Sequence, residues 1–190
     1  MKTSVKIGIA FALIWMIINM IVFYVGGSIG FFKIGILINV FLLMAGIAVG
    51  LYLSKKDEGF AVGHFLADFK AAMQTGIIYT ILVAGFAYLY HERIDPSIRN
   101  TMISERTADL NAKFPDDSNF MALQETDPTW AGKSFDDFIE NKEDNFESIF
   151  SSSSVFIAHL MGLTFFAGFY SFFVTLIFRK VVMKGSQKKS

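Results

Sequence analysis

The run IGIAFALIWMIINMIVFYVGGSIGFF, residues 7–32, contains no Asp, Glu, Lys or Arg. Three further runs without these residues cover 34–54, 71–91 and 148–178. A helix rises 1.5 Å per residue, so about 20 apolar residues cross a hydrocarbon core roughly 30 Å thick. Lipid offers the backbone no hydrogen-bond partner, so each run is expected to cross as a helix. The sequence therefore predicts an all-α integral membrane protein with four transmembrane helices.

Charge is divided unevenly along the chain. The 17 Lys and Arg balance the 17 Asp and Glu, but residues 91–150 carry six of these cations against fourteen carboxylates. The rest of the chain therefore carries eleven cations against three carboxylates. Under the positive-inside rule the basic segments belong on the cytoplasmic side; they are Lys2, Lys6, Lys55, Lys56, Lys70, and the tail of Arg179, Lys180, Lys184, Lys188 and Lys189. This pattern predicts both termini inside (N-in/C-in); the reversed orientation is the alternative.

The expected organisation has three parts. Residues 1–90 hold the first three transmembrane helices and a cytoplasmic amphipathic helix near 60–70, indicated by Val62, Phe65, Leu66 and Phe69. Residues 91–150 form an acidic extracytoplasmic segment, whose aromatic residues recur at helical spacing and predict a small helical cap between spans three and four. Residues 151–190 hold the fourth transmembrane helix and the basic cytoplasmic tail. The first apolar run is too long for a secretory signal, so it is interpreted as an uncleaved helix.

Two trios of small or polar residues predict close packing of the first two spans: Gly8, Ala12 and Asn19, and Asn39, Gly46 and Gly50. In an antiparallel hairpin each residue of one trio comes level with one of the other, in the pairs Gly8–Gly50, Ala12–Gly46 and Asn19–Asn39. The two amides are then expected to hydrogen-bond each other, which contributes roughly 0.6 to 2 kcal/mol. The alternative is that the asparagines line a polar pathway for a substrate or ion.

Two histidine positions are candidates for a site. His64 and Asp68 stand at i, i+4 on the expected amphipathic helix, where they form a possible cytoplasmic interface pair for protons or a metal. Two ligands do not complete a metal site, so a solvated contact at the headgroups is the simpler interpretation. His159 lies inside the fourth run, where an ionisable group is a functional candidate, although a helix-packing role is also expected near the interface.

Motifs of enzymes and nucleic-acid-binding proteins are missing from the sequence. It has no glycine-rich phosphate loop, no zinc-protease helix, no nucleophile elbow and no basic groove with interleaved aromatic residues. The absence of Cys excludes disulfides and thiolate zinc sites. We therefore expect no catalytic residues, no cofactor, no metal and no nucleic-acid partner; a membrane enzyme using His64–Asp68, or His159 with outer carboxylates, is the less favoured reading.

With these residues in view, the chain resembles the bacterial inner-membrane family known as domain of unknown function 4199. The resemblance rests on the glycine-rich first hairpin, on the turn Asp57-Glu58-Gly59-Phe60 with Phe65, Phe69 and Lys70 after it, and on Tyr88 through Ile94-Asp95-Pro96. It covers most of the chain, although the stretch from about 107 to 150 is longer and more acidic than the family's pattern. The resemblance implies a multi-pass protein of the bacterial inner (cytoplasmic) membrane. The family has no established activity, so it supplies no catalytic residue.

Two functions remain as hypotheses. The first is a non-enzymatic accessory or scaffold subunit of a cell-envelope complex, embedded in the lipid bilayer and bound to an envelope protein partner or to further copies of itself. The alternative is a small oligomeric transporter or lipid-binding membrane protein, with Asn19, Asn39, Gln74 and His159 along a pathway.

Overall fold

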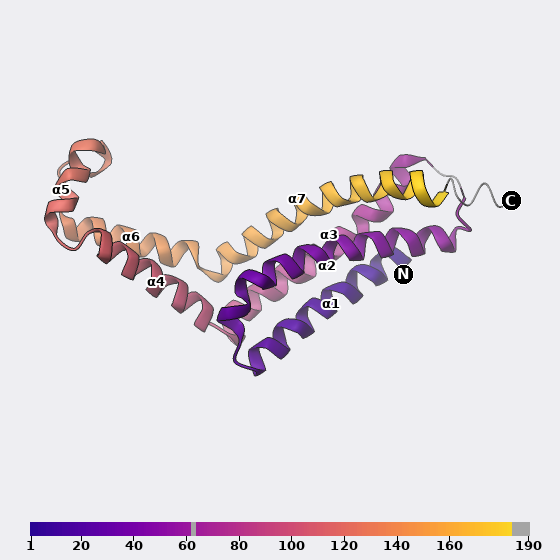
Figure 1. The fold of residues 1–190 in the computed structure, drawn as a ribbon, viewed down its shortest axis with the longest axis horizontal. Helices are drawn as coiled ribbons and strands as arrows, with labels where there is room; N and C mark the ends of the chain where they lie inside the picture. Colours follow the sequence, from indigo (N-terminus) through magenta and orange to yellow (C-terminus); the bar gives the residue numbers. More distant parts are fainter. Residues whose placement is uncertain (62–63, 184–190) are drawn as a thin grey trace. The chain divides into compact units, whose positions relative to one another are not determined.

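A computed structural model of the protein describes residues 1–61 and 64–183 (Figure 1). These residues form helices and no strand, which confirms the predicted all-α class. The elements are α1 (Thr3–Tyr24), α2 (Ser28–Asp57), α3 (Phe65–Leu89), the π-helical turn η1 (Tyr90–Ile94), α4 (Ser97–Lys113), α5 (Asp117–Thr126), the 3-10 turn η2 (Pro128–Trp130), α6 (Phe135–Ile149), α7 (Ser152–Phe178) and the π-helical turn η3 (Arg179–Met183).

Four helical segments are long and apolar enough to cross a membrane, as predicted: Thr3–Tyr24, Ser28–Asp57, Phe65–Ile94 and Ser152–Val182. Each contains most of one charge-free run and extends beyond it at one end or both. Residues 65–70 form the first turns of α3 and not a separate amphipathic helix, because the α-helical hydrogen bonding continues without interruption to Leu89. Val62, and the tail lysines Lys184, Lys188 and Lys189, lie outside the described residues.

The chain divides into two compact units. The four-helix unit comprises Met1–Tyr88 and Phe156–Ser190, and the acidic unit comprises Leu89–Val155. The acidic unit contains residues 91–150 and their fourteen carboxylates.

All four long helices contribute to the core of the four-helix unit. Ala12, Leu43, Ile47, Leu51, Ala72, Val83 and Ala167 are each 0% exposed. At one end of this unit α1 begins, α2 ends, α3 begins and α7 ends (Figure 1). We call it the basic end, because Lys2, Lys55, Lys56, Lys70 and Arg179 belong to these four helix ends.

Glycines bring α1, α2 and α3 together at the level of Thr75. A Cβ atom added to Gly8 would lie 2.7 Å from the Thr75 carbonyl oxygen, and one added to Gly50 would lie 2.3 Å from Thr75 Oγ1. Gly8 and Gly50 were predicted to lie opposite each other. Both residues face Thr75 of α3, so a third helix takes part in this contact. Gly46 faces Phe11, which is the neighbour of the predicted partner Ala12. Three helices therefore meet where the sequence predicted a pair.

The end of α2 is shaped by two consecutive residues with positive φ, Gly59 at 63° and Phe60 at 56°. Phe60 is not a glycine, so this conformation is uncommon for it. Its amide donates to the Lys55 carbonyl at 2.8 Å, and its ring lies 5.8 Å from that of Tyr52. The turn therefore folds back onto α2 and brings the Ala61 carbonyl to the Lys55 side chain.

The acidic unit has its own aromatic core. Phe138 of α6 is 1% exposed, and its ring centroid lies 4.9 Å from that of Phe114, 5.1 Å from that of Phe120 and 4.9 Å from that of Trp130. The aromatic spacing predicted a helical cap here, but it did not predict the two short elements α5 and η2. These short elements carry Phe120 and Trp130 into the core, and Gln124 holds η2 by donating to the carbonyls of Trp130 and Lys133.

The start of α6 is a capping box. Ser134 Oγ accepts from the Asp137 amide at 3.1 Å, and the Asp137 carboxylate accepts from the Ser134 amide at 3.0 Å. The hydrogen bonds from Ser134 lower the pKa of Asp137. Two unpaired amides of the first turn are thereby satisfied, which explains why an acidic sequence begins a helix here.

Substituting Gly50→Ala is expected to destabilise the protein by about 1 to 3 kcal/mol, because the new methyl group would overlap Thr75. Gly85→Ala is the matched control, since nothing lies within 4 Å of a Cβ atom at Gly85. The measurement is the free energy of unfolding during an SDS titration in mixed micelles. Adding Thr75→Ala to Gly50→Ala should recover much of the loss; equal effects of the two glycine substitutions would contradict the close approach.

Candidate functional site

A buried carboxylate, Asp68 of α3, lies at the basic end of the four-helix unit. Its side chain is 1% exposed. Oδ1 lies 2.6 Å from Lys55 Nζ on α2, and Oδ2 forms an ion pair with the Arg179 guanidinium just after α7. One carboxylate thus joins three of the four long helices.

The Lys55 side chain is 5% exposed and is surrounded by oxygen atoms. Besides Asp68, its ammonium donates to Glu58 Oε2 at 2.8 Å and to the Ala61 carbonyl at 3.3 Å. An ammonium has three N–H donors, and three oxygen atoms surround this one. The position of Ala61 depends on the turn formed by Gly59 and Phe60.

The ion cluster of Asp68, Lys55, Arg179 and Glu58 has no net formal charge. Two cations face the buried Asp68, and Glu58, whose side chain is 59% exposed, completes the balance at the surface. Burying ions is costly, and removing one member of a buried pair leaves an uncompensated charge. The arrangement can therefore hold helix ends together, and its buried carboxylate has both oxygens engaged by protein cations.

A polar layer lies beside the ion cluster. Ser4 Oγ donates to Gln74 Oε1 at 3.0 Å, and Thr75 Oγ1 donates to the Ser4 carbonyl at 3.1 Å. Thr3 Oγ1 donates to Asp57 Oδ2 at 2.5 Å. The start of α1 is thereby tied to the end of α2 and to α3. Lys2, Asp57, Lys70 and Gln74 are among the residues around an open hollow of about 340 Å³ at this end.

The predicted pair His64–Asp68 is wrong as a solvated contact. Asp68 is buried against Lys55 and Arg179, whereas His64 is exposed and precedes the first residue of α3. The helical spacing between Phe65, Leu66 and Phe69 suggested that Asp68 belonged to the polar side of a surface helix. In the bundle, Asp68 continues the inward-facing row of Ala72, Thr75 and Tyr79.

The predicted hydrogen bond between Asn19 and Asn39 is also wrong. Asn19 Nδ2 donates to the Trp15 carbonyl of its own helix at 2.8 Å. Asn39 Oδ1 accepts from the Tyr79 hydroxyl at 2.6 Å, and both of these residues are buried. The tyrosine belongs to α3, a third helix that the predicted hairpin of two spans did not include.

The other predicted positions lie in separate places. Gly8, Ala12, Gly46 and Gly50 are packing positions of α1 and α2. His159 is half-buried in the second turn of α7. The structure therefore brings Gly8 and Gly50 together through Thr75, and it brings Asp68 to two cations that sequence analysis did not select. The sequence does offer one sign of the Lys55–Asp68 contact. Lys55 directly follows the charge-free run 34–54, and Asp68 shortly precedes the next run, 71–91, so both lie at the same end of neighbouring spans.

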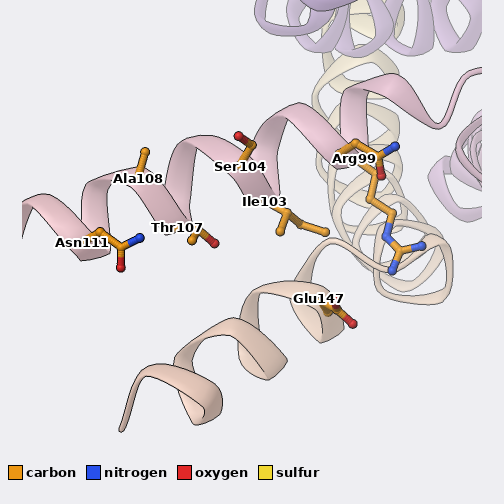
Figure 2. Close-up of a pocket in the computed structure, with 8 residues that line it drawn as sticks. Arg99, Ile103, Ser104, Thr107, Ala108, Asn111 and Glu147 are labelled. Carbon is orange, nitrogen blue, oxygen red and sulfur yellow. The ribbon is translucent and has the colours of Figure 1, made fainter. Parts of the chain in front are cut away.

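A second hollow, of about 550 Å³, lies between α4 and α6 in the acidic unit (Figure 2). Asn100, Ser104, Thr107 and Asn111 of α4 line it at helical spacing. Figure 2 shows Arg99 extending from α4 toward the end of α6 that carries Glu147. The Arg99 Nε atom is buried and makes no hydrogen bond within the described residues. This hollow offers hydrogen-bonding groups of both kinds beside an acidic helix.

Chemistry and family comparisons add little to this geometry. Within residues 1–61 and 64–183, no group of three or more His, Asp or Glu side chains could hold a metal ion. No family model matches the chain, and no curated protein or solved structure matches it. The function is therefore inferred from the residues and their geometry.

Lys55→Met is expected to destabilise the protein by about 3 kcal/mol, because Asp68 would lose one of its two ion pairs in a buried position. The neighbouring exposed residue supplies the control: Lys56→Met should change stability by less than about 0.5 kcal/mol. The free energy of unfolding in an SDS titration tests both variants. A loss of similar size from both would mean that only the net charge of this end matters.

Proposed function

We propose that the protein is a non-enzymatic accessory or scaffold subunit of a cell-envelope assembly in the bacterial inner membrane. In this proposal the four-helix unit is the membrane anchor. The acidic unit is an extracytoplasmic helical cap that recognises a protein partner. The resemblance to the family known as domain of unknown function 4199 belongs to the same proposal.

The N-in/C-in orientation is supported by the gathering of cations at one end of the four-helix unit. Lys2, Lys55, Lys56, Lys70 and Arg179 belong to that end, and Lys33 is the only Lys or Arg in the connection between α1 and α2 or the first two turns of α2. Short loops rich in Lys and Arg stay on the cytoplasmic side. The segment between α3 and α7 then lies outside the cytoplasm, in agreement with its excess of carboxylates.

A row of carboxylates on α6 is the observation that carries the proposal. Asp136, Glu140, Asp144 and Glu147 are exposed at spacings of four, four and three, which places them on one face of the helix. None of the four makes an ion pair in the part of the chain that the structure describes. Like charges at i, i+4 destabilise a helix by about 0.2 to 0.5 kcal/mol per pair. A basic partner surface would relieve this repulsion.

The hollow of Figure 2 adjoins this row, because Glu147 belongs to both. Its amide and hydroxyl groups suit a partner segment that needs hydrogen bonds as well as charge. The aromatic core around Phe138 holds α6 in place, so the row is presented on a folded surface and not on a loop.

Transport is less well supported than docking. Asn39 is bonded to Tyr79, and Gln74 is bonded to Ser4. The fully buried Leu43 and Ile47 of α2 belong to the core, and they lie along the helix between Asn39 and Gly50, which faces Thr75. Asn39 and Gln74, which were selected for a pathway, are thus satisfied locally by residues outside that set. Lipid binding keeps one supporting observation, an aromatic groove in the acidic unit.

The test is in-cell crosslinking of the tagged full-length protein, purification in mild detergent and mass spectrometry of co-purifying proteins. We expect a stoichiometric partner, whose recovery falls when 0.5 M NaCl screens the charges. Recovery of the partner should be lost in the variant D136N/E140Q/D144N/E147Q. It should be kept in the control K56Q, which removes a charge from the basic end of the four-helix unit. Purification of the chain without another protein, in wild type and variant alike, would contradict the proposal.

A further inference from the structure

The acidic unit contains a groove of about 580 Å³ with an aromatic floor. We call its aromatic lining residues Phe114, Trp130, Phe138 and Phe146 the floor of the groove. Trp130 is 6% exposed and Phe138 is 1% exposed, and their rings pack edge to face at 4.9 Å. The floor is thus part of the core of this unit and exists before any ligand arrives. Its volume lies in the range of about 300 to 1,000 Å³ that small-molecule ligands occupy.

Cations are concentrated around this groove. Arg106, Lys113 and Lys142 line it, which is half of the six Lys and Arg in residues 91–150. Only Asp109 and Asp127, two of the fourteen carboxylates in the same segment, line it with them. The groove is therefore a locally positive place in a strongly negative unit.

The ammonium of Lys142 lies over two aromatic rings of the floor. It is 5.5 Å from the centroid of the Trp130 ring and 5.6 Å from that of Phe138. Both distances fit cation–π contacts, which hold an ammonium over an aromatic surface. A ligand that covers these rings would therefore meet the positive charge of Lys142 at the same time.

We propose that this groove binds a single-chain amphiphile with an anionic head group, of the fatty-acid class. The alkyl chain would lie over the aromatic floor, where the burial of its methylene groups favours binding. The head group would lie beside Lys142, with Arg106 and Lys113 on the same rim. A neutral chain would leave these cations unmatched. A small anion without a chain would leave the half-buried Phe146 and the exposed Ile149 of the groove in contact with water. The chain ends of the unit continue directly into α3 and α7, so the groove belongs to a protein that is in contact with lipid.

This inference does not depend on the proposed partner surface. The carboxylates of the row belong to α6, whereas the cations of the groove are Arg106 and Lys113 of α4 and Lys142 of α6. Lys142 stands between Glu140 and Asp144 in sequence. Neutralising the row is therefore expected to leave amphiphile binding intact, so failure of one proposal can be told apart from failure of the other.

The chain contains two tryptophans, Trp15 in α1 and Trp130 in the groove. In the variant Trp15→Phe, which keeps an aromatic ring against Phe31, Trp130 becomes the only fluorescent indole. We would titrate this full-length variant in lipid nanodiscs with decanoate and with decan-1-ol, using empty nanodiscs to correct for partition. Decanoate should change the Trp130 emission saturably at one site. Decan-1-ol should bind at least about fivefold more weakly than decanoate.

Lys142→Gln and Lys133→Gln form the matched pair of variants. Lys133 also lies over the Trp130 ring, at 4.8 Å, but it does not line the groove. Lys142→Gln should weaken decanoate binding about fivefold and leave decan-1-ol unchanged, whereas Lys133→Gln should leave both unchanged. Circular dichroism verifies that both variants are folded.

Three outcomes would overturn the inference. They are the absence of a saturable emission change, equal affinities for decanoate and decan-1-ol, and equal losses in the two lysine variants. Occupation of the groove by a segment of a protein partner, found by crosslinking from residue 146, would also overturn it.

Discussion

The buried ion cluster around Asp68 is the contact on which the four-helix unit most depends. A carboxylate that is 1% exposed needs compensation, and Lys55 and Arg179 supply it from two other helices. Because lipid offers helices no hydrophobic reason to associate, packing and polar contacts must hold them together. The cluster does this at the basic end, while Gly8, Gly50 and Thr75 bring three backbones into close contact nearby.

Sequence alone predicted the part of the fold that depends on composition. The four charge-free runs gave the four long helices, since both length and apolarity are local properties. It did not predict the partners of Asn39 and Asp68, because these come from helices far away in the chain and their choice depends on which faces meet. Tyr79 and Arg179 carried no local signal for these roles. In the acidic unit the spacing of the aromatic residues predicted helices, but α5 and η2 are too short to carry a periodic pattern.

The two faces of α6 connect the proposals for the acidic unit. One face carries four carboxylates that make no ion pair among the described residues, and the other carries Phe138 and Phe146 with Lys142 beside them. A helix of this kind can present charge to a protein and an aromatic surface to an amphiphile. In this account the membrane helices contribute anchoring and orientation.

The most direct test of the central claim is a double-mutant cycle between Asp68 and Arg179, measured as the free energy of unfolding in an SDS titration. The account predicts that Asp68→Asn and Arg179→Gln each destabilise the protein, and that their coupling energy reaches at least about 1 kcal/mol. Arg179→Gln should then cost little when Asp68 has already been replaced, because it removes a cation that no longer has its partner. Additive losses would show that the two groups act independently and would contradict the cluster as the interaction that holds the helices together.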